Sequence, residues 1–152
     1  MPRVAVEELI GAPPALVWSE LRDIAGHVAW MADAAAIRFT SDQREGPGTA
    51  FDCETRVGPI RLLDRMVVTE WVDGRSIGVR HVGLVAGTGR FRIEPADADG
   101  TTTRCSWEEE LRFPWWLGGP LGAAVAGPLV LRPLWARNLE RLHAVVLARA
   151  AA

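Results

Sequence analysis

Three residues of the types used in acid–base chemistry lie in segments that alternate between apolar and polar side chains: Asp64, His81 and Glu109. Each shares the parity of the apolar side chains, which predicts that all three face inward. Histidine exchanges protons near neutrality, burial lowers its pKa and a neighbouring carboxylate raises it. The pattern therefore predicts an acid–base cluster in which His81 is the base or proton shuttle, titrating near working pH, and Glu109 orients it.

Each of these residues also has a purely structural interpretation. His81 fits a hydrogen-bonded core histidine or a wet position at a cavity mouth, and Asp64 lies between Arg61 and Arg65, either of which could pair with it. Glu109 stands in a run of three glutamates, and a bulge in its strand would turn it to solvent. An inward carboxylate is costly without a partner, so each of these positions needs a partner or a chemical role.

Other chemistries find little support in the sequence. All 17 basic residues are arginine, and tyrosine is absent, which excludes Schiff-base catalysis and a phenolic general acid. The histidines have no metal-ligand spacing, and Gly87 and Gly89 form a GxG that enters a strand rather than a helix. Cys53 and Cys105 fall at inward strand parity and are expected to be buried, reduced thiols. We expect neither a metal nor a cofactor.

The composition is that of a globular protein. The chain has 152 residues, 49% apolar and 24% charged, with a formal charge of −2. Its length fits a single domain, residues 1–152, and the charge balance argues against a nucleic-acid partner. The first ten residues are too short and too acidic for a signal peptide, so a cytoplasmic location is expected.

The elements that must position the candidate residues are mostly strands. Period-two patterns separated by glycine and proline turns predict seven strands, at 3–10, 37–41, 49–57, 60–71, 76–83, 88–94 and 102–113. A helix begins at Pro13 and Pro14 with Leu16, Val17, Leu21 and Ile24 on one face, and a short helix covers about 25–31. A long helix over 133–149 carries an apolar stripe of Trp135, Leu139, Leu142 and Val146.

One segment lacks charge altogether. Residues 113–131 contain three prolines and four glycines in nineteen residues, which argues against a membrane span although the length reaches about 18 residues. We expect an irregular, mobile lid over a pocket, with Trp115, Trp116, Leu117 and Leu121 as apolar cover. The alternative is a contact patch for a partner or for transient membrane contact, without stable insertion.

Several motifs together resemble the polyketide cyclase/dehydrase family of the START-like (SRPBCC, helix-grip) superfamily. They are IGAPPALVW at 10–18, Trp30, GPGT at 46–49, VTEW at 68–71, DGTT at 99–102 with Trp107, and LERL at 139–142. The resemblance implies an α+β helix-grip fold, in which a seven-stranded curved antiparallel sheet grips a C-terminal helix over an apolar cavity. The family has no common catalytic residue, so the resemblance assigns no catalytic role.

The leading functional hypothesis is a carrier or sensor that binds a hydrophobic or amphipathic small molecule, such as a polyketide, an isoprenoid, a quinone or a lipid. The alternative is a polyketide cyclase or aromatase-dehydratase that uses the inward acid–base residues. The expected ligand-binding residues are apolar and mostly aromatic: Phe51, Met66, Val79, Phe91, Trp107, Trp115, Trp116, Leu121 and Trp135.

Overall fold

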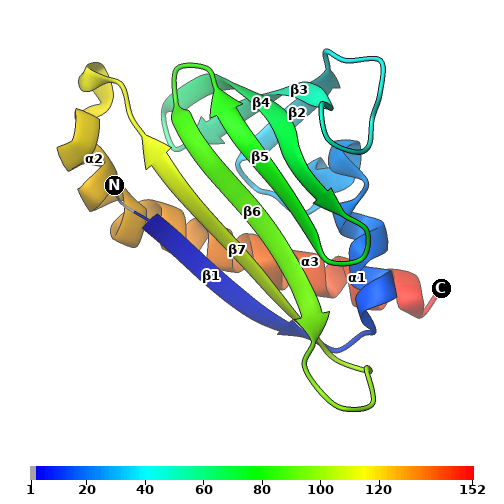
Figure 1. Cartoon of the computed structure of the whole chain (residues 1–152). Coiled ribbons are helices and arrows are strands. Elements are labelled where there is room, and N and C mark those ends of the chain that lie inside the picture. The colour runs from blue at the N-terminus through cyan, green and yellow to red at the C-terminus, as the bar shows by residue number, and fades with distance from the viewer. Residues whose placement is uncertain (1–2) are drawn as a thin grey trace.

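A curved antiparallel sheet forms the body of the protein. The computed structural model describes residues 3–152, and the first two residues of the predicted domain lie outside that range. The sheet follows the order β1-β7-β6-β5-β4-β3-β2, so each strand from β2 to β7 pairs with its sequence neighbour and β1 closes the far edge (Figure 1). The strands are β1 (Arg3–Ile10), β2 (Ala34–Phe39), β3 (Ala50–Val57), β4 (Ile60–Val72), β5 (Ser76–Val82), β6 (Ala86–Pro95) and β7 (Thr103–Arg112). This confirms the predicted fold class.

Two strand starts differ from the sequence prediction. Strand β2 begins at Ala34 rather than 37, because its alanine-rich start pairs with Thr55 through a bulge although it shows no apolar alternation. Strand β6 begins at Ala86 rather than 88, so the glycines predicted to form a turn lie within the strand. There Gly87 and Gly89 pair with Leu111 and Glu109 of β7.

Two short helices connect β1 to β2. Helix α1 (Pro14–Leu21) starts at the double proline as predicted, and the next element is a 3-10 helix, η1 (Ile24–Ala29). Leu16 was expected on the buried face of α1, but it is exposed, and Trp18 is buried in its place. Trp18 packs edge-on against Trp71 of β4 at 5.5 Å between ring centroids, which fixes α1 to the end of the sheet.

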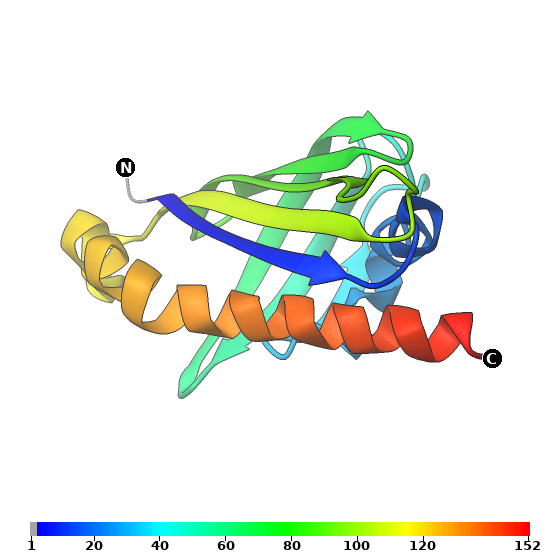
Figure 2. The same cartoon turned by 90° about the horizontal axis from the view of Figure 1, so that it is seen from below.

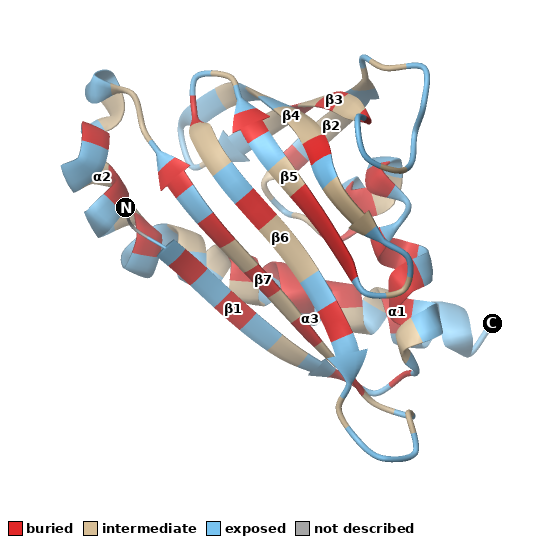
Figure 3. Cartoon of the chain, viewed as in Figure 1, coloured by how far each residue is buried: buried red, intermediate tan, exposed pale blue. Residues whose placement is uncertain are grey.

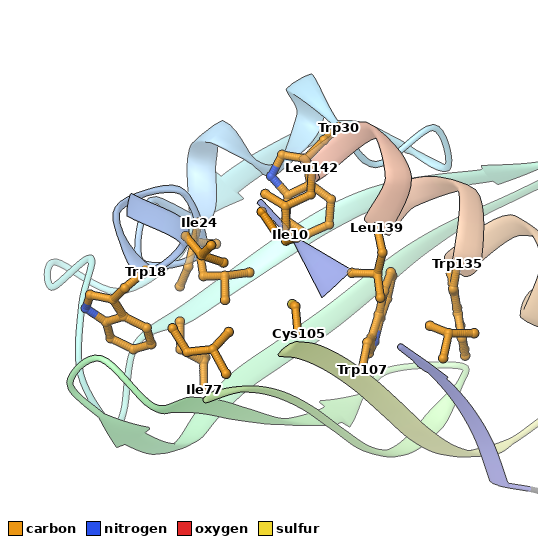
Figure 4. Packing of buried hydrophobic residues seen from close by; sticks show 14 of the residues in the cluster. Ile10, Trp18, Ile24, Trp30, Ile77, Cys105, Trp107, Trp135, Leu139 and Leu142 are labelled. Carbon is orange, nitrogen blue, oxygen red and sulfur yellow. The ribbon is translucent and has the colours of Figure 1, made fainter. Parts of the chain in front are cut away.

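The long C-terminal helix α3 (Arg132–Ala150) lies across the concave side of the sheet (Figure 2). Its predicted stripe is buried as expected: Trp135, Leu139, Leu142 and Val146. Trp135 stacks on Trp107 of β7 with ring centroids 4.9 Å apart and an interplanar angle of 25°. Figure 4 shows this contact beside Leu139, with Cys105 and Ile10 farther along the same core.

The uncharged segment 113–131 is helical, which corrects the prediction of an irregular lid. It forms a 3-10 turn η2 (Trp115–Leu117), helix α2 (Gly119–Ala126) and a π-helical turn η3 (Gly127–Leu131) that runs directly into α3. Much of α2 faces away from the sheet (Figure 3). The most exposed side chains are apolar: Trp115 at 87%, Leu121 at 75% and Leu129 at 71%.

The helical run Trp115–Ala150 is long and apolar enough to cross a membrane by length and composition alone. Core helices of soluble proteins pass the same test. The second half of this run is α3, whose buried stripe packs on the sheet, and a membrane span would give up that packing.

Candidate functional site

An apolar cavity of about 280 Å³ lies between the concave face of the sheet and the helical run that contains α3. This volume is near the lower end of the range for small-molecule pockets, about 300–1,000 Å³. Six of the predicted ligand-binding residues line it, and their side chains come from five strands and α3: Phe51, Met66, Val79, Phe91, Trp107 and Trp135.

The other three predicted ligand-binding residues, Trp115, Trp116 and Leu121, are not among the cavity-lining residues. They were expected to cover the pocket, but the helical geometry of 115–126 turns them outward. Leu117, which was also expected to cover the pocket, does line it. The same segment closes one end of the cavity with Leu117 and four other side chains, namely Phe113, Ala126, Val130 and Leu131.

The three predicted acid–base residues come together at the wall of this cavity. Nδ1 of His81 lies 2.9 Å from both carboxylate oxygens of Asp64. On the other side of the ring, Nε2 lies 3.5 Å from Oε1 of Glu109, an ion-pair distance without hydrogen-bond geometry. Trp107 donates from Nε1 to the same Glu109 oxygen at 3.2 Å, which fixes the carboxylate in place.

The missing side chain of Gly89 allows this contact to form across a strand. His81 lies on β5 and Glu109 on β7, with β6 between them, and their pairing partners on β6 are Gly87 and Gly89. A Cβ added at Gly89 would lie 2.8 Å from Oε1 and 3.0 Å from Cγ of Glu109, so its absence lets the imidazole and the carboxylate meet over the middle strand. Gly87 has a different role, because a Cβ there would collide with the backbone oxygen of Glu110 on β7.

The role of Gly89 was missed at the sequence level, although the signal was present. Gly87 and Gly89 share the inward parity of Phe91 in the same strand. Two inward glycines in succession leave a gap on the concave face, and glycine within a strand often marks such a close approach. The GxG was instead assigned to a turn.

The cluster fixes the charge of the imidazole. Burial lowers the pKa of His81, but the carboxylates of Glu109 and Asp64 on either side of the ring outweigh it and raise the pKa to about 10. His81 is therefore an imidazolium at neutral pH. The predicted titration near working pH is wrong, because sequence reasoning placed only one carboxylate beside the ring.

A fourth polar residue of the cavity, Asp33, was not predicted. It precedes β2, and its Oδ1 accepts a hydrogen bond from Nδ2 of Asn138 on α3 at 2.7 Å. Burial raises the pKa of Asp33, against the hydrogen bonds from Asn138 and Trp135. No motif marks Asp33, because the residues that hold it at the cavity, Asn138 and Trp135 on α3 and Arg56 on β3, are all distant in the chain.

One further histidine and the two thiols near the cavity are neutral at pH 7. Burial lowers the pKa of His27 to about 4, and its Nε2 lies 2.8 Å from the backbone oxygen of Leu21. Burial raises the pKa of Cys53 to about 11 and that of Cys105 to about 12, so neither thiol is an activated nucleophile. Within residues 3–152, no group of three or more His, Cys, Asp or Glu side chains is placed to hold a metal ion.

The amino-acid sequence matches a known protein family over almost the whole chain. The family described as polyketide cyclase/dehydrase and lipid transport matches residues 1–147. This chain belongs to that family. No curated protein sequence matches the chain at a significant level.

Solved structures with the same fold cover nearly the full length of the chain. The structure of TTHA0849 from Thermus thermophilus is 19% identical with a TM-score of 0.78, covering 97% of this chain and 99% of that one. The Zhui aromatase/cyclase from Streptomyces sp. R1128 is 17% identical with a TM-score of 0.79, covering 98% and 95%. At this identity the likeness shows the helix-grip fold, and the site has to be argued from its own residues.

Proposed function

We propose that this family member binds a hydrophobic or amphipathic small molecule, such as a polyketide, an isoprenoid, a quinone or a lipid, as a carrier or sensor. The observation that carries the proposal is the cavity itself, whose wall is mostly apolar and aromatic with a few polar groups at defined positions. Binding sites for small organic molecules have this composition. The family description, which includes lipid transport, supports the same class of ligand.

A dye-binding experiment with a cavity-filling variant tests this proposal. The neutral dye phenylnaphthylamine should gain fluorescence when it enters the cavity of the unaltered protein. Val79→Phe adds bulk to a cavity-lining position of β5, and it should weaken dye binding several-fold or more. Val82→Phe makes the same change on the same strand at a half-exposed position outside the cavity, and it should leave dye affinity unchanged. Equal affinity of both variants would show that the dye binds elsewhere.

Ligand loading from a membrane surface is a further part of the proposal. The segment 113–131 closes the cavity on one side and exposes Trp115, Leu121 and Leu129 on the other. Exposed apolar patches of this kind mark contact sites, and tryptophan favours the membrane interface.

A vesicle-binding experiment tests this contact. Leu121→Ala should reduce co-sedimentation with phosphatidylcholine/phosphatidylglycerol vesicles. Leu9→Ala, at an exposed position on β1, is the matched control. Equal co-sedimentation of both variants would contradict membrane contact through this segment.

A second candidate function is polyketide cyclisation with loss of water. The cluster of Asp64, His81 and Glu109 favours it, because a carboxylate would take a proton from the carbon next to one carbonyl as that carbon adds to a second carbonyl. The raised pKa of His81 changes its predicted role, since an imidazolium donates a proton and does not act as a base. His81 would protonate the oxygen of the attacked carbonyl, which becomes a hydroxyl, and would regain a proton from the carboxylic acid. In the second step the carboxylate would take another proton from the same carbon while His81 protonates the hydroxyl, which leaves as water as the carbon–carbon double bond forms.

Mass spectrometry of a poly-β-keto thioester analogue incubated with the protein tests this second candidate. Catalysis predicts a product lighter by one water that forms faster with the unaltered protein than with Glu109→Gln. Glu110→Gln is the matched control, because Glu110 lies next in β7 and is exposed. If the analogue loses water no faster with the protein than without it, cyclisation is contradicted and the binding function alone remains.

A further inference from the structure

The polar groups at the cavity wall carry an excess of negative charge. His81 contributes one positive charge, and the carboxylates of Asp64 and Glu109 on either side of it contribute two negative charges. The other cation of the lining, Arg90, is paired with Glu70 at 2.8 Å between Nε and Oε2. The cluster of Asp64, His81 and Glu109 therefore carries a net charge of −1, and Asp33 is a further acid on the same cavity.

The same groups also offer more hydrogen-bond acceptors than donors. Most nitrogen donors at the wall are already engaged: Nδ1 of His81 contacts Asp64, Trp107 donates to Glu109, and Trp135 hydrogen-bonds Asp33. Nε2 of His81 makes no hydrogen bond, but it faces Glu109 at an ion-pair distance of 3.5 Å. Each carboxylate has about four acceptor sites. Two N–H groups, one from His81 and one from Trp107, hydrogen-bond Asp64 and Glu109, so most of the acceptor sites remain for a ligand.

We propose that the ligand of this cavity is an apolar molecule, neutral or cationic, that carries a hydroxyl or ammonium donor, and that organic anions are excluded. This inference rests on the proposed binding function. A ligand hydroxyl or ammonium group would donate to Asp64 or Glu109. A ligand carboxylate would instead be desolvated beside like charges with no free cation to pair with among the described lining residues.

The inference narrows the proposed ligand classes. Phenolic polyketides and hydroxylated isoprenoids combine an apolar body with a donor, and they fit the cavity wall. Fatty acids are anions at neutral pH, and quinones offer only acceptor oxygens. Both would leave the acceptors of the cavity wall without a donor.

Calorimetric titration with four ligands of one shape at pH 7 tests the inference. The series is β-naphthol, naphthylmethylammonium, β-methoxynaphthalene and β-naphthoate, which differ in donor capacity and charge. We expect the naphthol and the ammonium compound to bind most tightly, and the methoxy compound several-fold more weakly. The Kd of β-naphthoate should be higher than that of β-naphthol by on the order of tenfold or more.

Variants locate the source of this discrimination. Glu109→Gln removes one negative charge from the cavity wall and should reduce the ratio of the Kd of β-naphthoate to the Kd of β-naphthol, here called the Kd gap. Asp64→Asn removes a charge on the other side of the imidazole and should act in the same direction, which gives a second test if either variant folds poorly. Glu110→Gln makes the same change on the exposed face of β7 and should leave the Kd gap unchanged.

The outcomes separate this inference from the proposed function. If β-naphthoate binds as tightly as β-naphthol, the charge selection is wrong while cavity binding stands. The same conclusion follows if the Kd gap persists in both Glu109→Gln and Asp64→Asn. If no member of the series binds, the proposed binding function fails and the inference fails with it.

Discussion

His81 is held between two carboxylates, and this arrangement links its charge to the stability of the protein. The folded-state pKa of about 10 lies above the ordinary value of 6.5. The stabilisation is therefore fully present below pH 6.5, declines as the pH rises, and is lost once the pH passes about 10. The slope for one such group is at most about 1.4 kcal/mol per pH unit.

Removal of one carboxylate should therefore shift the titration of His81. In Glu109→Gln the pKa of His81 should fall, because the charge of Glu109 is the largest cause that raises it. An NMR titration of the imidazole protons measures this pKa directly. Urea denaturation between pH 6 and pH 10 should show that the free energy of unfolding of Glu109→Gln declines at a lower pH than that of the unaltered protein. Glu110→Gln should titrate like the unaltered protein. An unchanged pKa in Glu109→Gln would contradict the described contact.

Gly89 provides a second test at the level of one residue. In Gly89→Ala the new methyl group meets the side chain of Glu109, which must move away from His81. We expect a lower pKa of His81 and a loss of about 1–3 kcal/mol in the free energy of unfolding. Thr88→Ala, at the exposed neighbouring position, is the control. If both variants behave alike in NMR titration and urea unfolding, Gly89 has no special role.

Strand parity alone predicted the inward orientation of Asp64, His81 and Glu109. Their electrostatics were less accessible from sequence, because the pKa of His81 depends on two partners that lie on different strands. Asp33 was not predicted at all. It reaches the cavity through Asn138, a contact between residues 105 positions apart in the chain, which no local pattern marks.

Helix α3 was predictable because its apolar residues, from Trp135 to Val146, repeat at the helical period over about three turns. The element that precedes it was not. Three prolines in 113–131 suggested an irregular chain, but Pro120 lies in the first turn of α2, where a missing amide costs no hydrogen bond. Pro128 lies at the start of the π-helical turn η3. Pro120 thus begins a helix, and Pro128 coincides with the change from α-helical to π-helical geometry inside a continuous helical run.

The packing of α3 on the sheet predicts a difference between its two faces. Leu139 is fully buried, so Leu139→Ala should lower the free energy of unfolding by about 2–5 kcal/mol. Leu147 lies two turns further along α3 and is 42% exposed, so Leu147→Ala should cost much less. Urea denaturation of both variants measures the difference. Equal losses would contradict the burial of the α3 stripe.

At the scale of the whole molecule, the sheet, α3 and the segment 113–131 enclose one apolar cavity with a polar cluster on its wall. The strand pattern and the family motifs were sufficient to predict this architecture. They could not predict which side chains of 113–131 face inward, because that depends on helical geometry that the glycine and proline content obscured. Of the expected cover, Leu117 lines the cavity, and Val130 and Leu131 take the place expected for Trp115 and Leu121.

The central claim is that a ligand enters this cavity, and isotope-filtered NMR with bound β-naphthol tests it most directly. We predict nuclear Overhauser effects from the naphthol ring to the methyl groups of Leu62 and Val79, which line the cavity from β4 and β5. Effects confined to the methyl groups of Leu121 and Leu129, which are exposed on α2 and η3, would place the ligand on the outer surface and contradict the claim.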